Sequence, residues 1–367
     1  MSTTPAQHPA NLQGLNYRDE AERLGKPVLP IIDAHTHING NKAAQLYHQV
    51  ARRFGISQIH SMTHLENVNE VRDILGDALT LIAVPQFNAQ DLEKAFTTEW
   101  LERIEKFADL GCRICKFWAA PRAKDYAKEF GDPNLMNIDS IWRRRAMERA
   151  RNCGMFFMVH IADPDTWFAE KYTDQSFYGS KLQQYEPFEK MINEYQDIPW
   201  LAAHMGGYPE DLEFLDGLLT RNPNLYLDTS ATKWMVRELS KHSRNDFISF
   251  LTKWKGRILF GSDIVVNESH LESTSEDRSG RDAQASTEKE AFDLYASRYF
   301  ALRTLFETDH KGPSPIADPD LHMVDPDNHS ENDSPMLKGH RLPPDILQSL
   351  YHDAANNLMQ TWLAKHH

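Results

Sequence analysis

Four apolar stretches of this 367-residue sequence end in side chains that could bind a metal ion. The first ends in His35 and His37, two positions apart, and the others end in His160, His204 and Asp263. Alternate residues of a strand share one face, so both imidazoles of the His-x-His pair can point the same way. Three neutral imidazoles and a carboxylate suit Zn²⁺ or a similar divalent ion and leave one position for water.

Each of these residues taken singly has a more ordinary explanation. A buried histidine is more often a hydrogen-bonded core residue than a ligand, and Asp263 could cap a helix after the last strand. The combination favours the metal site, because the ends of four apolar stretches, in chain order, all carry such groups. The sequence therefore predicts that these side chains meet at one place.

Eight β-prone segments alternate with helix-like stretches, which favours a closed TIM-type (β/α)8 barrel over an open sheet. The segments are residues 28–38, 57–65, 78–87, 111–118, 155–163, 200–207, 224–230 and 257–265. The carboxyl ends of the strands converge on one mouth of such a barrel, which would bring the candidate ligands together. The sequence lacks a G-x-G-x-x-G turn, so we expect no nucleotide cofactor.

The barrel is expected to occupy residues 28–367, with residues 1–27 as an N-terminal extension. Two polar stretches after the eighth strand, about 267–285 and 311–344, predict long insertion loops, which could form a lid or could be poorly ordered. Helices are expected at 291–306 and, after paired prolines, at 343–363.

Composition narrows the classes of function. The net charge of -13 argues against nucleic acid or anionic membranes as partners, because no face could easily present a dominant positive potential. No apolar run approaches the roughly 20 residues of a membrane-spanning helix. Three cysteines do not suggest a disulfide framework, so we expect a cytoplasmic protein.

The sequence resembles the amidohydrolase superfamily, specifically the amidohydrolase-2 (amidohydrolase-related) family. The matching motifs are IIDAHTH, MVHIAD, LAAHMGG and ILFGSD, which cover about residues 30 to 265, and LPPDILQSLYHDAANNLM resembles the closing helix of that family. The resemblance implies that His35, His37, His160 and Asp263 bind metal. It implies for His204 either a second metal site or contact with substrate.

The chemistry of these groups supports hydrolysis of an ester, lactone or amide of a small molecule, carboxylated ones included. A bound divalent ion, most simply zinc and one or two per chain, activates a water molecule. Asp263 can accept the proton of that water, and His204 could stabilise the developing oxyanion. The alternatives are a metal-dependent decarboxylase or hydratase on the same barrel and, less favoured, a barrel that binds metal or ligand without catalysis.

Lys116 has three interpretations of similar weight. It lies in the fourth predicted strand, where some amidohydrolases place a carbamylated lysine that bridges two metal ions. A carbamate would convert the cation to an anion and let it join a metal site. The other readings are a contact with a substrate carboxylate and a lysine stem that packs in the barrel.

Further residues near strand ends are candidates for substrate binding. They are Lys116, Trp118, Arg122, Trp167, Tyr208 and Lys233. Large aromatic side chains in such loops are more often packing residues, and the cations are as often solvated surface charges. The expected partner is a small-molecule substrate, and assembly into a homo-oligomer is left open.

Overall fold

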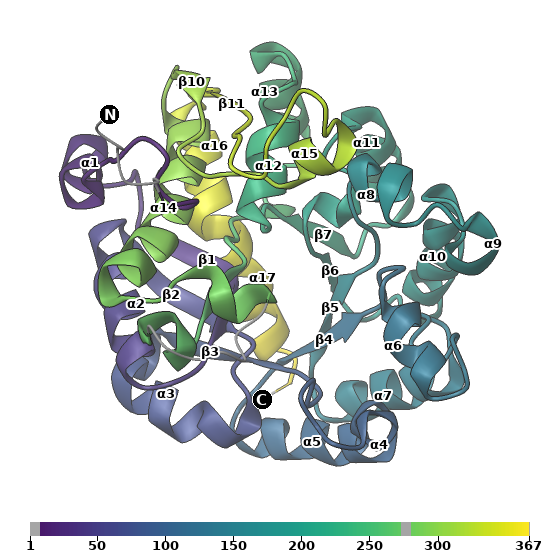
Figure 1. The fold of residues 1–367 in the computed structure, drawn as a ribbon. Coiled ribbons are helices and arrows are strands. Elements are labelled where there is room, and N and C mark those ends of the chain that lie inside the picture. The colour runs from purple at the N-terminus through teal and green to yellow at the C-terminus, as the bar shows by residue number, and fades with distance from the viewer. Residues whose placement is uncertain (1–7, 273–279, 367) are drawn as a thin grey trace.

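The computed structural model describes residues 8–272 and 280–366. Its main sheet is entirely parallel, with the strand order β8-β7-β6-β5-β4-β3-β2-β1-β9. The strands are β1 (Ile31–Ile38), β2 (Ile56–Ser61), β3 (Leu79–Ala83), β4 (Ile114–Trp118), β5 (Phe156–His160), β6 (Trp200–Ala202), β7 (Leu225–Asp228), β8 (Ile258–Leu259) and β9 (Ile264–Val266). Each of the eight predicted segments contributes, and the predicted TIM-type barrel is confirmed (Figure 1).

The last predicted strand differs in detail, because it forms both β8 and β9. The backbone of Asp263 has a φ of 59°, a left-handed conformation that interrupts a strand. On either side of this corner the chain bonds to β1: Ala34 N–H donates to the Phe260 carbonyl (2.9 Å), and Asp263 N–H donates to the His35 carbonyl (2.8 Å). Pairing of β9 with β1 closes the barrel.

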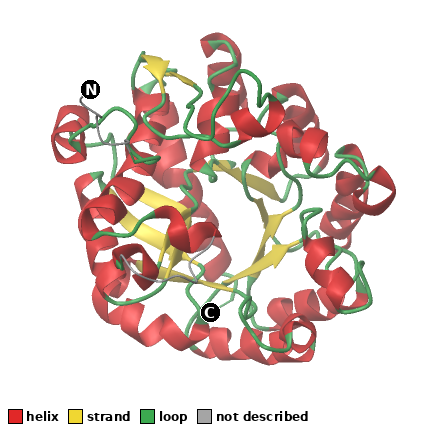
Figure 2. Cartoon of the chain, in the orientation of Figure 1, coloured by secondary structure: helices red, strands yellow, loops and turns green. Residues whose placement is uncertain are grey.

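Helices surround the sheet on its outer side (Figures 1 and 2). They are α1 (Tyr17–Leu24), α2 (Lys42–Arg53), α3 (Val68–Leu75), α4 (Leu92–Phe96), α5 (Thr98–Asp109), α6 (Ala123–Glu129), α7 (Ile141–Asn152), α8 (Asp165–Glu170), α9 (Gln175–Tyr178), α10 (Tyr185–Glu194), α11 (Leu212–Arg221), α12 (Thr232–Leu239), α13 (Arg244–Lys253), α14 (Glu288–Glu307), α15 (Asp320–Val324), α16 (Pro344–Gln348) and α17 (Ala354–Leu363). A π-helical turn, Ser349–Asp353, joins the last two.

Local signals explain where several helices begin. The Ser140 hydroxyl accepts the Arg143 N–H and caps α7, and the Thr287 side chain does the same for Glu290 at α14. The helix predicted at 291–306 lies within α14, and the stretch 343–363 is α16, the π-helical turn and α17. The paired prolines precede the closing helix as expected, with Pro344 in its first turn.

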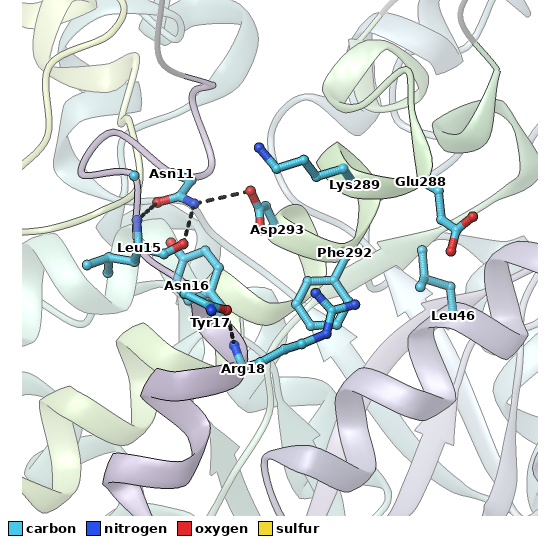
Figure 3. A pocket seen from close by; sticks show the side chains of 11 residues that line it. Asn11, Leu15, Asn16, Tyr17, Arg18, Leu46, Glu288, Lys289, Phe292 and Asp293 are labelled. Atoms are coloured by element: carbon cyan, nitrogen blue, oxygen red, sulfur yellow. Dashed lines mark hydrogen bonds between the residues drawn. The ribbon is translucent and has the colours of Figure 1, made fainter.

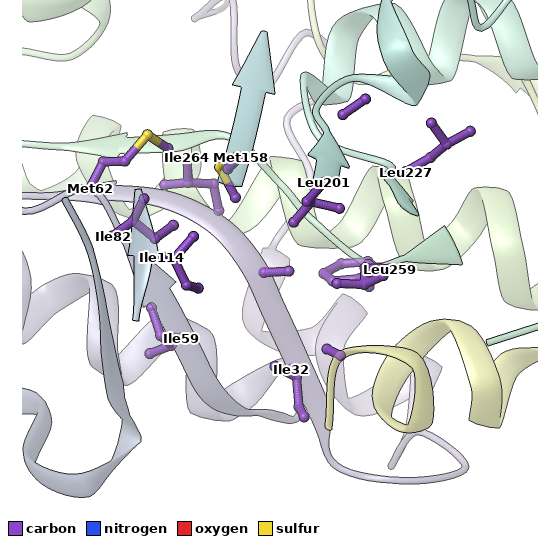
Figure 4. Packing of buried hydrophobic residues seen from close by; sticks show 14 of the residues in the cluster. Ile32, Ile59, Met62, Ile82, Ile114, Met158, Leu201, Leu227, Leu259 and Ile264 are labelled. Atoms are coloured by element: carbon purple, nitrogen blue, oxygen red, sulfur yellow. The ribbon is translucent and has the colours of Figure 1, made fainter. Parts of the chain in front are cut away.

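Apolar side chains from the strands fill the barrel interior (Figure 4). Ile114 and Met158 are buried without exposed surface. Because side chains two apart on a strand share a face, Lys116 and His160 follow these residues on the same face. The packed interior therefore directs the next inward side chains of β4 and β5 to the mouth of the barrel.

The N-terminal extension docks on α14 (Figure 3). The Asn11 amide donates to Asp293 (3.1 Å), and the Arg18 guanidinium stacks on the Phe292 ring at 4.0 Å. These residues line a surface pocket between the extension and α14. Residues 1–7 of the predicted extension lie outside the described part of the chain.

The two predicted insertions contain short elements. The first holds single 3-10 turns at Glu268–Leu271 and Gly280–Gln284, and its residues 273–279 lie outside the described ranges. The second holds an antiparallel hairpin, β10 (Lys311–Pro313) with β11 (Met336–Lys338), and α15 between them. Among the described residues, no helix is long and apolar enough to cross a lipid bilayer.

Candidate metal centre

His35, His37 and Asp263 form one cluster at the carboxyl ends of β1 and β8. Their nearest ligand atoms all lie within 4.8 Å of one another. Asp263 Oδ1 is 3.1 Å from His37 Nε2 and 3.5 Å from His35 Nε2. The predicted His-x-His pair and the predicted carboxylate are thus brought together.

Asp33 braces the corner that carries Asp263. Its buried carboxylate accepts hydrogen bonds from the backbone N–H (3.1 Å) and the hydroxyl (2.6 Å) of Ser262. It also accepts the His35 N–H (3.1 Å) and the Tyr299 hydroxyl of α14 (2.8 Å). One side chain therefore ties β1, the β8–β9 corner and an outer helix together, which fixes the left-handed backbone next to it.

A second cluster joins His35 and His204 to Asp228 at the end of β7. His35 Nδ1–H donates to Asp228 Oδ2 (2.9 Å), because a carboxylate can only accept, and this leaves Nε2 free to face Asp263. The Asp228 carboxylate also accepts the backbone N–H of His204 (2.9 Å) and of Ser230 (3.0 Å). Such carboxylate–imidazole pairs orient the histidine ligands of metal sites.

Ser230 orients the ring of His204. Its hydroxyl donates to Asp228, so Ser230 Oγ is the acceptor in its 2.8 Å contact with His204 Nδ1. In the neutral imidazole this leaves Nε2 with its lone pair available. His204 has a left-handed backbone (φ 60°), which turns the chain out of the sheet directly after β6.

His160 lies beside the two clusters. Its ring centroid is 4.4 Å from that of His204, but among the described residues it belongs to neither three-residue cluster. His160 Nε2–H donates to Asp163 Oδ1 (2.9 Å), and the Tyr172 hydroxyl donates to Asp163 Oδ2 (2.6 Å). Because Asp163 takes Nε2, Nδ1 is the nitrogen that remains for a ligand.

Lys116 places a cation in the barrel interior near these groups. Its side chain comes from β4, is 5% exposed, and within the described part of the chain its ammonium has no hydrogen-bond partner. Burial lowers the pKa of Lys116 to about 8, although Asp228 and Asp263 oppose this shift. The neutral amine is therefore accessible near neutral pH.

The remaining predicted substrate contacts are placed differently from one another. Trp167 packs on Trp234, which in turn contacts the metal cluster. Trp118 packs against Phe87, which follows β3, and against Tyr126 of α6. The other three are Arg122, which is exposed; Tyr208, which packs on Phe214 with Lys181 over its ring; and Lys233, in the first turn of α12.

Two residues of the centre were missed by the sequence prediction, and one was undervalued. Asp228 lies in the seventh predicted strand segment but was not predicted as a ligand, yet it holds both His35 and His204. Ser230 follows it at strand spacing, a period of two that could have drawn attention to the pair. Trp234 carries no local signal, because its contact with His204 depends on how α12 follows β7.

Comparison with known families shows to which family the chain belongs. The profile of the amidohydrolase-2 family, described as Amidohydrolase, matches residues 32–309, which is more than half of the sequence. The chain belongs to this amidohydrolase family. The matched range holds every candidate ligand from His35 to Asp263, so the resemblance predicted from the motifs is confirmed.

Solved structures resemble this amidohydrolase at low identity. A probable 2-pyrone-4,6-dicarboxylic acid hydrolase from Acinetobacter baumannii is 10% identical, with a TM-score of 0.40 over 81% of this chain and 99% of that one. An amidohydrolase from Burkholderia multivorans is 11% identical, with a TM-score of 0.37 over 72% of this chain and 99% of that one. A 5-carboxyvanillate decarboxylase from Novosphingobium aromaticivorans, in complex with manganese, is 12% identical, with a TM-score of 0.31 over 65% of this chain and 86% of that one.

One curated sequence also matches in part. An uncharacterized RNA pseudouridine synthase from Helicobacter pylori is 26% identical over 198 residues, which are 53% of this chain and 56% of that protein. The amidohydrolase therefore spans about half the length of the curated relative that it matches. A match of this extent does not transfer the RNA-modifying activity.

The imidazoles of the amidohydrolase centre are held neutral. Burial lowers the pKa of His37 to about 4, although the hydrogen bond to Asp263 opposes the shift. Burial also lowers the pKa of His35, assisted by the charge of Lys116, and lowers the pKa of His204, assisted by His160. Neutral imidazoles present a lone pair, which is what a metal ion requires of histidine.

The carboxylates of the centre are held ionised. Burial alone would raise the pKa of Asp263, but the hydrogen bond from His37 and nearby positive charge lower it well below its usual range. Asp228 follows the same pattern, with His35 and Lys116 outweighing burial. Neutral imidazoles beside ionised carboxylates are the donor set of a divalent cation, so the residues present fit the metal that the family implies.

Proposed function

We propose that this amidohydrolase is a metal-dependent hydrolase that cleaves an ester, lactone or amide of a small molecule, with carboxylated molecules included among its substrates. The observation that carries the proposal is the placement of Asp263. Its ionised carboxylate lies 3.1 Å from His37 Nε2 and 3.5 Å from His35 Nε2, at a corner braced by Asp33. A carboxylate fixed beside neutral imidazoles can both hold a cation and accept a proton.

The residues that would hold the ion are His35, His37 and Asp263, with His160 and His204 beside them. A divalent cation bound there lowers the pKa of a coordinated water and polarises the substrate carbonyl. The nitrogen-rich set favours Zn²⁺ among the first-row ions. We infer at least one ion per chain. A second ion depends on whether Lys116 is carbamylated.

Asp263 is the proposed proton carrier. Its free oxygen can take a proton from the attacking water and deliver it to the leaving group. His204 donates Nδ1–H to Ser230, so its neutral Nε2 offers a lone pair and no proton. This tautomer favours His204 as a ligand over a donor to the substrate oxygen.

Lys116 keeps two proposed functional roles. Its amine, which has no hydrogen-bond partner among the described residues, lies near Asp228 and Asp263 and could react with carbon dioxide to form a carbamate, whose negative charge would join a second ion. As an ammonium it could instead hold a substrate carboxylate. Elemental analysis separates these roles: two ions per chain in the wild type and one in Lys116→Ala support the carbamate. One ion in both proteins contradicts it.

The metal assignment is tested by removing the histidine pair. The double variant His35→Ala/His37→Ala should lose most of its bound zinc and its turnover, measured by elemental analysis after dialysis and by hydrolysis of pooled lactones and amides. The matched control is His310→Ala. His310 is exposed, directly precedes the second insertion and lies outside both clusters. Full zinc occupancy in the double variant would show that the ion binds elsewhere.

Non-oxidative decarboxylation or hydration is the alternative that one observation favours. Lys116, whose ammonium has no hydrogen-bond partner in residues 8–272 and 280–366, could orient a carboxylated substrate for loss of carbon dioxide. The purified zinc-loaded protein is incubated with pooled lactones, amides and aromatic carboxylic acids while acid release and carbon dioxide are measured separately. Carbon dioxide without a hydrolytic product would replace the hydrolase proposal with the lyase. Neither product from a fully loaded protein would favour a non-catalytic barrel.

We also propose the compartment and the partners of the enzyme. Cys112, Cys115 and Cys153 are unpaired, which suits a reducing compartment, and we infer the cytoplasm. The net charge of -13 favours small molecules over nucleic acid as partners. A homo-oligomer would be revealed by light scattering of the purified protein.

A further inference from the structure

Trp234 lies directly against the histidines of the candidate metal centre. Its ring centroid is 5.6 Å from that of His204 and 6.4 Å from that of His160, with nearly perpendicular ring planes at the first contact. The residue sits in the first turn of α12, four positions beyond Ser230, which orients His204. The indole is only partly buried, so part of its surface beside these imidazoles is exposed.

A second indole packs against the first. The ring of Trp167, in α8 after β5, packs edge-on against Trp234 at a centroid distance of 5.3 Å. Such perpendicular pairs are the favoured arrangement of aromatic rings. The Lys171 ammonium lies over the Trp167 ring, 3.6 Å from its centroid. We name Trp167 and Trp234 together the indole wall.

The indole wall is anchored by the segment inserted after the barrel. Trp167 Nε1–H donates to Asp320 Oδ2 (2.9 Å) at the start of α15. Asp320 also lies 3.2 Å from the Arg237 guanidinium of α12, and Arg237 Nη2–H donates to the Thr166 hydroxyl (3.2 Å). Asp320 is 8% exposed and Arg237 4%. The three helices α8, α12 and α15 lie next to one another at this side of the barrel (Figure 1).

The buried pair is completed by Asp318, which forms a second ion pair with Arg237 and accepts the Asp320 N–H (3.2 Å). Two aspartates of the insertion therefore share one guanidinium from α12. Because charges are buried only when paired, this arrangement fixes the insertion to the helix that carries Trp234. The same carboxylate that pairs with Arg237 also holds the indole of Trp167.

We propose that Trp234 is a substrate-contacting residue that forms one side of the reaction site, and that Asp320 is a positioning residue that holds it there through Trp167. Trp234 places an apolar ring next to the imidazoles, and this ring takes the apolar part of the substrate while the polar groups meet the metal ligands. This inference rests on the proposed metal centre and adds the side of the site that determines specificity.

The first test uses Co²⁺, an ion that quenches indole emission at short range. Co²⁺ is titrated into the metal-free protein while tryptophan fluorescence is recorded, and bound Co²⁺ is counted by equilibrium dialysis. The wild type should lose emission in step with binding, and Trp234→Phe should lose most of that quenching without losing the ion. Trp254→Phe is the matched control, because this indole also donates to an aspartate, Asp216 (2.9 Å), but lies at the end of α13.

The second test separates positioning from general stability. Asp320→Ala removes the acceptor of Trp167, so the indole wall should become more accessible and acrylamide should quench it more strongly than in the wild type. Asp320→Asn retains an oxygen acceptor for the indole and should restore the wild-type quenching. The control is Asp327→Ala, an exposed aspartate of the same insertion. Melting temperatures of all variants exclude unfolding as the cause.

The outcomes distinguish this inference from the proposed function. Co²⁺ that binds stoichiometrically without quenching, or quenching that persists in full in Trp234→Phe, overturns the indole wall and leaves the metal centre standing. Equal acrylamide quenching in Asp320→Ala and the wild type overturns the role of Asp320. Failure of the wild type to bind Co²⁺, or equal binding in His35→Ala/His37→Ala, contradicts the metal centre and the wall's place beside it together.

Discussion

Two buried aspartates lie beside His35, and their pKa values are shifted in opposite directions. Asp33 and Asp228 are both without exposed surface. Burial raises the pKa of Asp33 to about 7, although four hydrogen bonds from neutral donors oppose it. The pKa of Asp228 is lowered, because His35, His204 and Lys116 outweigh burial. Equal burial thus gives opposite results, because His35 donates its ring N–H to Asp228 and Lys116 adds a positive charge beside it, whereas Asp33 meets neutral donors.

Asp33 and Asp228 therefore have different roles around the candidate metal centre. Asp33 meets hydroxyl and backbone groups, so it can brace the β8–β9 corner in either protonation state. Asp228 must stay ionised to hold the Nδ1–H of His35 and to balance the cation beneath it. Matched substitutions of the two aspartates should therefore have very different effects.

The largest effect is expected from Asp228→Asn. The substitution removes the negative charge that orients His35. It also places an amide N–H donor beside the N–H groups that Asp228 accepts in the wild type. Loss of such an orienting carboxylate lowers metal affinity by about 10- to 100-fold. Zinc affinity measured by competition with a chromophoric chelator gives the result. An affinity equal to that of the wild type would show that Asp228 does not orient the ligands.

Metal removal should separate the two aspartates through stability. Zinc at about 100 times its dissociation constant raises the free energy of unfolding by about 2.7 kcal/mol. Chemical denaturation with zinc and with chelator should show this difference in the wild type and in Asp33→Asn. Asp228→Asn should show a much smaller difference at the same zinc concentration, and the same difference there would contradict the assignment.

A smaller loss is expected from Asp33→Asn. The asparagine oxygen still accepts from the Ser262 backbone, and the hydroxyls of Ser262 and Tyr299 can rotate to accept from the amide. The cost should be about 1 kcal/mol of unfolding free energy, the scale of one exchanged hydrogen bond. Denaturation in chelator measures it. Loss of zinc as severe as in Asp228→Asn would erase the distinction drawn between the two carboxyl groups.

A loss of similar size is expected at the outer end of the Asp33 cluster. Tyr299→Phe removes one hydroxyl donor to Asp33 and the 2.6 Å partner of the Tyr47 hydroxyl, at a cost of about 1 kcal/mol. Tyr47→Phe is the matched control, since it removes only the second of these bonds. A loss for Tyr47→Phe that exceeds the loss for Tyr299→Phe would show that the contact with Asp33 contributes nothing.

The local sequence pattern was sufficient to predict the barrel and the core of the candidate metal centre. Alternation of apolar and polar residues marks each strand, and the rule that parallel strands end at one mouth predicts that His35, His204 and Asp263 meet. The break within the last predicted strand was not foreseen, because it depends on the bonds of Asp263 and Phe260 to β1. Such pairing between distant segments leaves no local mark.

The rest of the site could not be read from neighbours in the chain. Trp234, Trp167 and Asp320 come from three separate segments, and each looks like a common surface or packing residue in isolation. Asp228 was visible as a polar strand end, but its hold on His35 requires knowing that the sheet closes and leaves only the β8–β9 segment between β7 and β1. The substrate contacts predicted from residue type alone, such as Arg122, include exposed side chains.

The late position of α15 in the chain has a consequence for biosynthesis. Every candidate ligand up to Asp263 has left the ribosome before Asp320 is made, since synthesis proceeds from the N-terminus. A nascent chain that ends at β9 therefore carries all the candidate ligands without the carboxylate that secures Trp167. The order of translation would allow an ion to be captured before the site acquires the side that selects its substrate.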